Sequence, residues 1–188
     1  MNDPEFGDGM SDAQVTAAAN LNANETSKVV KAANIAVKTN SEGQIVYPIT
    51  ITGTLKILNL GQVEWSRGNF HTGSNIFTIG FKSVRDHQSM FTIGARANYT
   101  CEILDGGKGP LFKVTCSEDP SNPIIKDTAS GVWVEFCRKI NETTQARKGK
   151  PSVSGPDRYG LSEPAVLRLL QSLPNVDKLE NYKFRKFV

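Results

Sequence analysis

The residues with the most obvious chemical potential are the five from Asp105 to Gly109, which read Asp-Gly-Gly-Lys-Gly. A glycine-rich run with a lysine can hold phosphate, because backbone N–H groups and the ammonium reach the same oxygens. The spacing argues against that use. A nucleotide-binding loop needs glycine where this chain has Glu102, and serine or threonine where it has Gly109. A strand-like segment follows, so no helix N-terminus would face a phosphate, and the run is typical of a hairpin turn.

Other reactive side chains are few. The two histidines, His71 and His87, have no cysteine, histidine or acidic residue at the spacing of a metal site, and no Cys-x-x-Cys occurs. The three cysteines have no regular spacing, which indicates a reducing compartment and small buried side chains. No Gly-x-Ser-x-Gly motif is present. We therefore predict no catalytic residue, no metal site, no cofactor and no enzymatic activity.

The elements around the turn alternate between apolar and polar residues. The segments 99–105 and 111–116 each do so, which predicts two strands of a hairpin with one face toward a core. The runs 45–51, 54–60 and 77–81 alternate in the same way, and Pro48 favours an edge position for the first of them. Short connections predict a mostly antiparallel sheet of about six strands.

Beyond residue 127 the apolar period changes to that of helices. One stripe runs from Val132 to Ile140, with Thr128 or Ser130 as the N-cap. A second helix is expected between Ser162 as N-cap and Pro174 as stop. A last short strand is expected within residues 182–187. Strands followed by helices predict an α+β fold, with two main helices packed on one face of the sheet.

The 188 residues divide by composition into a leader and a body. Residues 1–28 are poor in large apolar side chains, and we predict a flexible leader over residues 1–43 with a possible weak helix over 26–38. Residues 3–6, Asp-Pro-Glu-Phe, resemble a cloning remnant. Residues 44–188 are expected to form a single domain. No apolar run approaches the length of a membrane span, so we expect no membrane association.

The segment 99–115, YTCEILDGGKGPLFKVT, closely resembles the signature of the F/Y-rich N-terminal motif, FYRN. Residues 75–90 are similar to the upstream half of that motif. Residues 128–141 and 154–184 resemble the Gly-x-Trp and Ser-Gly-x-x-aromatic-Gly-Leu-Ser-x-Pro blocks of the partner motif, FYRC. On this resemblance FYRN covers about 75–125 and FYRC about 128–188. The two motifs together define the FYR-domain family, which includes trithorax-type (mixed-lineage leukaemia) methyltransferases, plant JmjC demethylases and transforming-growth-factor-beta regulators.

The resemblance marks a set of signature residues with mainly structural roles. They are Phe77, Gly80, Phe81, Ser83, Arg85, Tyr99, Asp105, Gly106, Gly107, Gly109, Pro110, Phe112, Gly131, Trp133, Gly155, Tyr159, Gly160, Leu161, Ser162, Pro164, Pro174 and Tyr182. In the methyltransferases and demethylases such segments accompany a separate catalytic domain. The resemblance therefore implies a non-catalytic, nuclear protein-interaction module for chromatin or transcription regulation, with partners such as subunits of a histone-modifying or remodelling complex or transcription factors.

Two other functions remain open from the sequence. The net charge is +3, and basic residues gather late in the chain, which would suit contact with a partner or with nucleic acid without sequence-specific reading. The candidates for that contact are Arg147, Lys148, Lys150, Lys183, Arg185 and Lys186. Alternatively, the segment 26–38 could drive self-association, which would make the chain a structural oligomerisation subunit. The sequence does not fix the oligomeric state.

Overall fold

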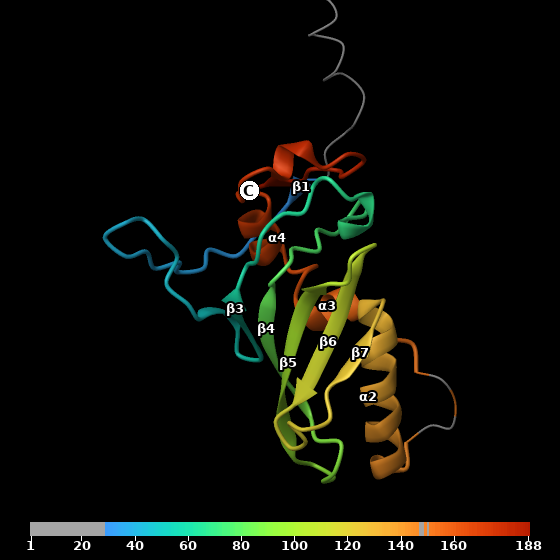
Figure 1. The fold of residues 1–188 in the computed structure, drawn as a ribbon. Helices are drawn as coiled ribbons and strands as arrows, with labels where there is room; N and C mark the ends of the chain where they lie inside the picture. The colour runs from blue at the N-terminus through green and yellow to red at the C-terminus, as the bar shows by residue number, and fades with distance from the viewer. Residues whose placement is uncertain (1–28, 147–148, 150) are drawn as a thin grey trace, which may run out of the picture.

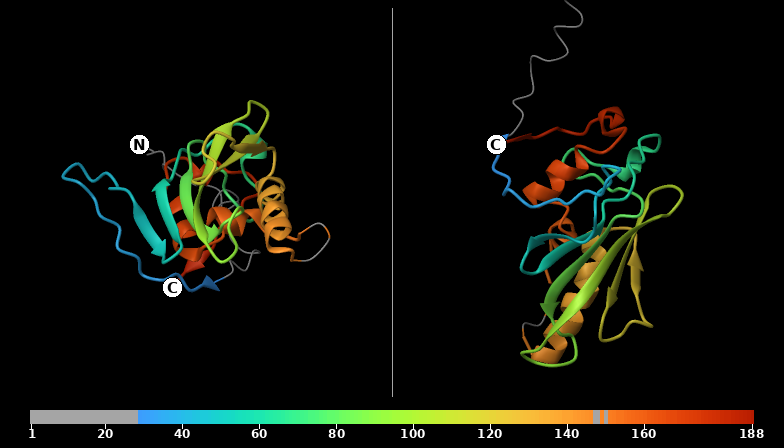
Figure 2. Two further views of the ribbon diagram at one scale, coloured as in Figure 1. Left: turned by 90° about the horizontal axis from the view of Figure 1, so that it is seen from below. Right: turned by 90° about the vertical axis from the view of Figure 1, so that its left-hand side faces the viewer.

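The computed structural model describes residues 29–146, 149 and 151–188. Six antiparallel strands form one sheet in the order β2-β3-β4-β5-β6-β7, and α2 and α3 lie against one of its faces (Figures 1 and 2). The strands and helices, in chain order, are β1 (Val29–Val30), β2 (Ile49–Thr52), β3 (Leu55–Asn59), η2 (Gly68–Phe70), β4 (Lys82–Gln88), β5 (Arg96–Asp105), β6 (Pro110–Cys116), β7 (Ile124–Lys126), α2 (Ala129–Thr144), α3 (Gly155–Tyr159), α4 (Pro164–Leu170), η3 (Val176–Lys178) and β8 (Lys186–Phe187). The predicted α+β class is confirmed.

The long hairpin β5–β6 forms the centre of the sheet. Its register pairs Tyr99 with Cys116 and Ile103 with Phe112, so these residues share one face, and all four are buried. The residues between them, such as Glu102 and Lys113, point to the opposite face. There the carboxylate of Glu102 accepts from the ammonium groups of Lys82 (3.3 Å) and Lys113 (3.2 Å). One sheet face is therefore core, and the other, here called the open face, is polar.

Helix α2 supplies the layer over the core face. The Oγ1 atom of Thr128 accepts a hydrogen bond from the N–H of Gly131 at 3.0 Å, which confirms the expected N-cap. The apolar stripe of α2 is buried, including Val132, Trp133, Phe136 and Ile140. The α4 helix begins at Pro164 with Glu163 as N-cap, one residue later than the expected Ser162.

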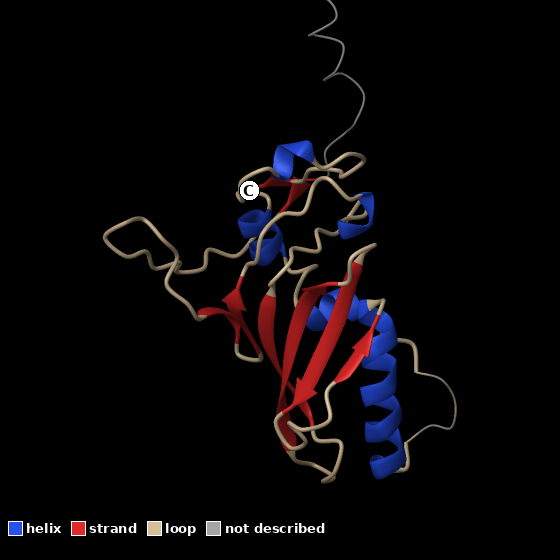
Figure 3. Ribbon diagram, viewed as in Figure 1, coloured by secondary structure: helices blue, strands red, loops and turns tan. Residues whose placement is uncertain are grey.

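Residues 77–81 do not form the expected strand. The backbone of Gly80 has a φ of +85°, which interrupts the extended chain before β4 begins at Lys82. Ile79 instead exchanges two backbone hydrogen bonds with Gln62, both at 2.9 Å. Most of the chain between β3 and β4 is loop (Figure 3). Two isolated bridges in this segment pair Gln62 with Ile79 and His71 with Ile76.

The two ends of the described chain also differ from expectation. The helix considered over 26–38 is absent from residues 29–38, because Val29–Val30 form a strand and an irregular segment follows; residues 26–28 lie outside the described part. The C-terminal strand covers Lys186–Phe187 alone and pairs in parallel with β1, not with the main sheet. Tyr182 is instead buried, with its ring 5.1 Å from that of Phe184.

Replacing Gly107 with valine should destabilise the protein. Gly107 has a φ of +81° in the turn between β5 and β6, and a β-branched side chain is strained there although the surrounding space is open. We expect the free energy of unfolding to fall by about 2 kcal/mol in urea denaturation. Gly53→Val is the control, because Gly53 lies in an open turn without positive φ. Equal stability of the two variants would refute this assignment of the turn.

Candidate functional site

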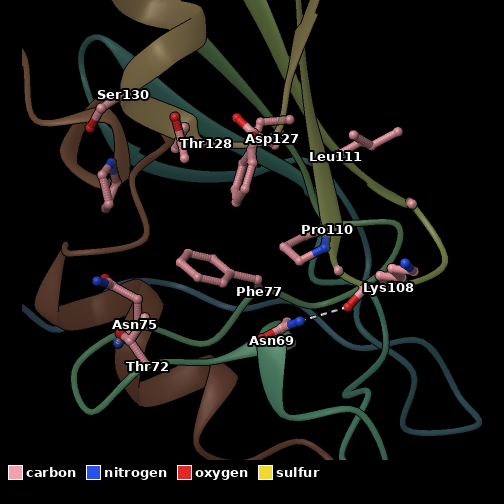
Figure 4. A pocket seen from close by; sticks show the side chains of 15 residues that line it. Asn69, Thr72, Asn75, Phe77, Lys108, Pro110, Leu111, Asp127, Thr128 and Ser130 are labelled. Carbon is pink, nitrogen blue, oxygen red and sulfur yellow. Dashed lines mark hydrogen bonds between the residues drawn. The ribbon is translucent and has the colours of Figure 1, made fainter.

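A groove of about 600 Å³ opens beside the β5–β6 turn, at the end of the sheet where α2 begins (Figure 4). We call it the junction groove. Its base is apolar, because buried or half-buried side chains of Phe77, Pro110, Phe112, Ala129 and Pro156 line it. Its rim is polar and mostly exposed, formed by Asn69, Thr72, Asn75, Lys108, Asp127, Thr128 and Ser130. An apolar base with a few polar groups around it is typical of a binding site.

Phe77 lies at the centre of the groove and is half-buried (Figure 4). Its ring meets that of Phe112 edge-to-face, with centroids 5.2 Å apart. Phe112 in turn meets Tyr159 edge-to-face at 5.6 Å. Such edge-to-face pairs stabilise fixed ring orientations. The floor of the groove is therefore continuous with the core between sheet and helices.

The turn that borders the groove is held by two residues from the loop before β4. The guanidinium of Arg67 donates to Asp105 at 2.8 Å and to the carbonyl of Gly107 at 2.7 Å. The same donation from Arg67 lowers the pKa of the Asp105 carboxyl. The amide of Asn69 donates to the carbonyl of Lys108 at 2.8 Å (Figure 4). Neither Arg67 nor Asn69 could be predicted from the sequence, because no periodicity in that polar segment distinguishes them.

Short helix α3 closes the groove on its other side and is fixed from β4. The hydroxyl of Ser83 donates to the carbonyl of Tyr159 at 2.8 Å. The guanidinium of Arg85 donates to the carbonyls of Arg158 (3.1 Å) and Asp157 (2.6 Å). Carbonyls at the C-terminal end of a helix lack partners within the helix, so these side chains satisfy them.

Tyr159 links α3 to the sheet from inside the core. Its side chain is fully buried, and its hydroxyl donates to the carbonyl of Lys113 at 3.1 Å. Burial raises the pKa of this phenol far above its usual value, so the hydroxyl stays a donor at all physiological pH. Tyr159 therefore acts as a structural anchor.

The described residues form no metal site, and burial makes their thiols poor nucleophiles. No group of three or more histidine, cysteine or acidic side chains lies close enough together to hold a metal ion, within the described ranges. Burial raises the pKa of the Cys101 thiol to about 12 and also raises those of Cys116 and Cys137. A thiol with a raised pKa is a poor nucleophile at neutral pH. Among the helices described, none is long and apolar enough to cross a bilayer.

His87 forms part of the aromatic cluster under α2. Its ring lies 5.6 Å from Trp133 and 6.1 Å from Tyr99, and its Nδ1 is buried without a hydrogen-bond partner among the described residues. Burial, followed by the positive charges of Arg158 and Arg96, lowers the pKa of His87 to about 4. The alternation of β4 turns His87 toward the core face of the sheet, beside these two rings.

The lowered pKa of His87 predicts loss of stability in mild acid. The imidazole of His87 binds a proton near pH 6.5 in the unfolded chain and near pH 4 in the folded chain. The stability that the neutral ring contributes is therefore fully present above pH 6.5 and declines as the pH falls toward 4. The ring is partly exposed, so we expect a loss of about 1–2 kcal/mol over this window rather than the full value of the shift. Urea unfolding at about pH 7 and pH 4.5 should show a smaller difference for His87→Gln than for the unchanged chain. Equal differences would contradict this role of His87.

Two known families match consecutive parts of this chain. The F/Y-rich N-terminus family, FYRN, matches residues 46–106, and the F/Y rich C-terminus family, FYRC, matches residues 109–187. The chain belongs to the FYR-domain family. The sequence motifs indicated starts near 75 and 128, whereas the matches begin at 46 and 109. The division between leader and domain at residue 43 remains a prediction.

The chain is similar to several larger proteins. Transforming growth factor beta regulator 1 of Mus musculus is 35% identical over 145 residues, which cover 77% of this chain and 36% of that protein. Histone-lysine N-methyltransferase trr of Drosophila melanogaster is 30% identical over 142 residues, 71% of this chain and 6% of that protein. Histone H3-lysine(4) N-trimethyltransferase ATX1 of Arabidopsis thaliana is 30% identical over 133 residues, which cover 65% of this chain and 12% of that protein. The chain thus spans about a third or less of these relatives.

The junction groove is lined by residues from both family matches. Its residues 69–77 and 106 belong to FYRN, and its residues 109–112, 127–130 and 156 belong to FYRC. Five signature residues line it: Phe77, Gly106, Gly109, Pro110 and Phe112. Each motif thus contributes one part of the wall.

The other signature residues hold the two motifs together or shape turns. Seven of them are buried: Phe81, Ser83, Tyr99, Trp133, Tyr159, Leu161 and Tyr182. The side chain of Arg85 donates to α3. Asp105 and Gly107 form the hairpin turn. Gly80 and Gly160 have positive φ, Gly131 leaves room for the cap of α2, and Gly155 packs against Ala129. Ser162 and Pro164 lead into α4, and Pro174 follows that helix.

The structure describes three of the six late lysines and arginines that were considered for partner or nucleic-acid contact. Arg147, Lys148 and Lys150 lie outside the described residues. Lys183, Arg185 and Lys186 lie in the C-terminal segment, where Lys186 belongs to β8. The side-chain amide of Gln171 donates to the carbonyl of Arg185 and accepts from its N–H, each at 3.0 Å. The contact role assigned to these six residues remains a prediction.

Proposed function

We propose that the chain is a non-catalytic protein-interaction module that binds a segment of a partner protein in the junction groove. The observation that supports this most is the groove itself, because both family motifs line it and its base is apolar. A volume of about 600 Å³ is enough for one or two large apolar side chains with their backbone. The polar rim offers hydrogen-bonding groups for that backbone.

We also propose that this module acts in the nucleus. Among the relatives, two are named as histone methyltransferases and one as a growth-factor regulator. The partner would be a subunit of a histone-modifying or remodelling complex, or a transcription factor. A catalytic role finds no support in the described thiols, histidines or carboxylates.

The experiment compares two tryptophan variants in co-purification from nuclear extract, with mass spectrometry of the retained proteins. Asn75→Trp fills the groove from its rim, and Asn98→Trp places the same side chain on the open face. We expect the unchanged chain and Asn98→Trp to retain the same stoichiometric nuclear partner, and Asn75→Trp to lose at least about 90% of it. Equal retention by all three proteins would refute the groove as the binding site. Retention of nucleic acid alone, lost as salt rises, would refute the proposed function.

A further inference from the structure

The turn that joins β4 to β5, residues 89–95, carries two large apolar side chains outward. Phe91 is 57% exposed and Ile93 is 69% exposed. We call this pair the apolar tip. The turn that carries the pair lies at the lower end of the sheet beside the C-terminal end of α2, whereas the β5–β6 turn, which borders the junction groove, lies at the other end of the strands (Figure 1). The proposed function does not use these residues.

The turn is held firmly despite its exposed side chains. The hydroxyl of Ser89, which is buried, accepts from the N–H groups of Phe91 (3.0 Å) and Thr92 (2.9 Å) and donates to the carboxylate of Glu118. Met90 is also buried, and its carbonyl accepts a hydrogen bond from the hydroxyl of Thr143 on α2. The backbone of Ser89 donates to Ala95 and closes the turn. The apolar tip is therefore presented in one backbone conformation.

Exposed apolar side chains on a preorganised turn are suited to binding. Exposing these apolar side chains to water is unfavourable, so burying them in a partner lowers the free energy. Their backbone is already ordered, so little conformational entropy is lost on association. An exposed aromatic and an exposed branched aliphatic side chain, two residues apart on one turn, are the kind of anchor that fills a pocket at an interface centre.

The charges near the tip define the partner. The carboxylate of Glu118 accepts a hydrogen bond from Ser89 of the turn, and Asp119 is the next residue along the chain. Arg96, the described cation nearest to the tip in sequence, is paired with Asp86 at 2.8 Å. An acidic border disfavours anionic lipid headgroups and favours basic side chains. We propose that the apolar tip inserts into an apolar cleft, bordered by basic side chains, of a second protein, independently of the junction groove.

The test begins with photo-crosslinking in nuclear extract from p-benzoylphenylalanine at position 93, with position 56 on the open face as control. The protein that crosslinks at 93 but not at 56 is then purified and titrated with the variants. We expect Phe91→Ser/Ile93→Ser to raise Kd at least about 30-fold with an unchanged melting temperature, since both side chains are exposed. Asp119→Lys should raise Kd several-fold, with the effect shrinking as salt rises.

The groove variant Asn75→Trp separates this inference from the proposed function, because it should leave Kd for the tip partner unchanged. A Kd unaffected by Phe91→Ser/Ile93→Ser would overturn the inference. So would crosslinking at 93 no stronger than at 56, or a crosslink to a second copy of this chain. Flotation with phosphatidylserine vesicles that depends on Phe91 and Ile93 would identify a lipid surface instead and would equally overturn it.

Discussion

Replacing Trp133 with alanine should lower the free energy of unfolding by about 3–5 kcal/mol. The indole is fully buried between α2 and the sheet, with ring centroids 5.2 Å from Tyr99 and 6.1 Å from Phe136. Its removal leaves a cavity that backbone elements on both sides prevent from collapsing. Chemical denaturation followed by circular dichroism measures this loss.

Trp65→Ala is the matched control for that substitution. Trp65 is 46% exposed and contacts Lys178, whose ammonium lies 4.6 Å from the ring centroid. We expect its loss to cost about 1 kcal/mol or less, because solvent replaces much of the contact. Similar losses for the two variants would show that the face of α2 toward the sheet is wrongly assigned.

Replacing Gly155 with alanine should be nearly as damaging, although it adds only one methyl group. A Cβ at this position would lie 2.1 Å from the carbonyl carbon of Ala129 and from the backbone nitrogen of Ser130. Backbone atoms cannot yield as a flexible side chain does, so α3 must move away from the start of α2. The shift would also strain the bond from the N–H of Gly155 to the hydroxyl of Ser130. We expect a loss of about 3 kcal/mol in urea denaturation.

Gly68→Ala provides the comparison, because a Cβ on Gly68 meets no atom within 4 Å and its φ is not positive. Its stability should stay within about 0.5 kcal/mol of the unchanged chain. Gly155→Ala should also weaken partner binding in the junction groove, since Ala129, Ser130 and Pro156 line that groove. Unchanged stability of Gly155→Ala would contradict the close packing of α3 on α2.

Local pattern was sufficient to predict the elements whose partners are close in sequence. The β5–β6 hairpin follows from alternation and a glycine-rich turn, and both are properties of consecutive residues. Helix α2 follows from its apolar stripe and its threonine cap. These elements form the centre of the fold, and so the α+β class could be predicted.

Local pattern was insufficient where a residue acts on a distant segment. Arg67 reaches Asp105 and Asn69 reaches Lys108, and nothing in their own loop distinguishes them. Helix α3 has five residues, too few for an apolar period, and its position depends on Ser83 and Arg85 of β4. The junction groove combines segments from both motifs, so it exists only once the whole domain has folded.

The most direct test of the proposed function is amide chemical-shift mapping of the 20.5 kDa chain as the purified partner segment is added. Binding in the junction groove predicts the largest shifts within residues 69–77, 106–112 and 127–130, and no saturable shifts in the Asn75→Trp variant. Shifts confined to the open face or to residues 183–186, with the groove amides unchanged, would contradict the central claim.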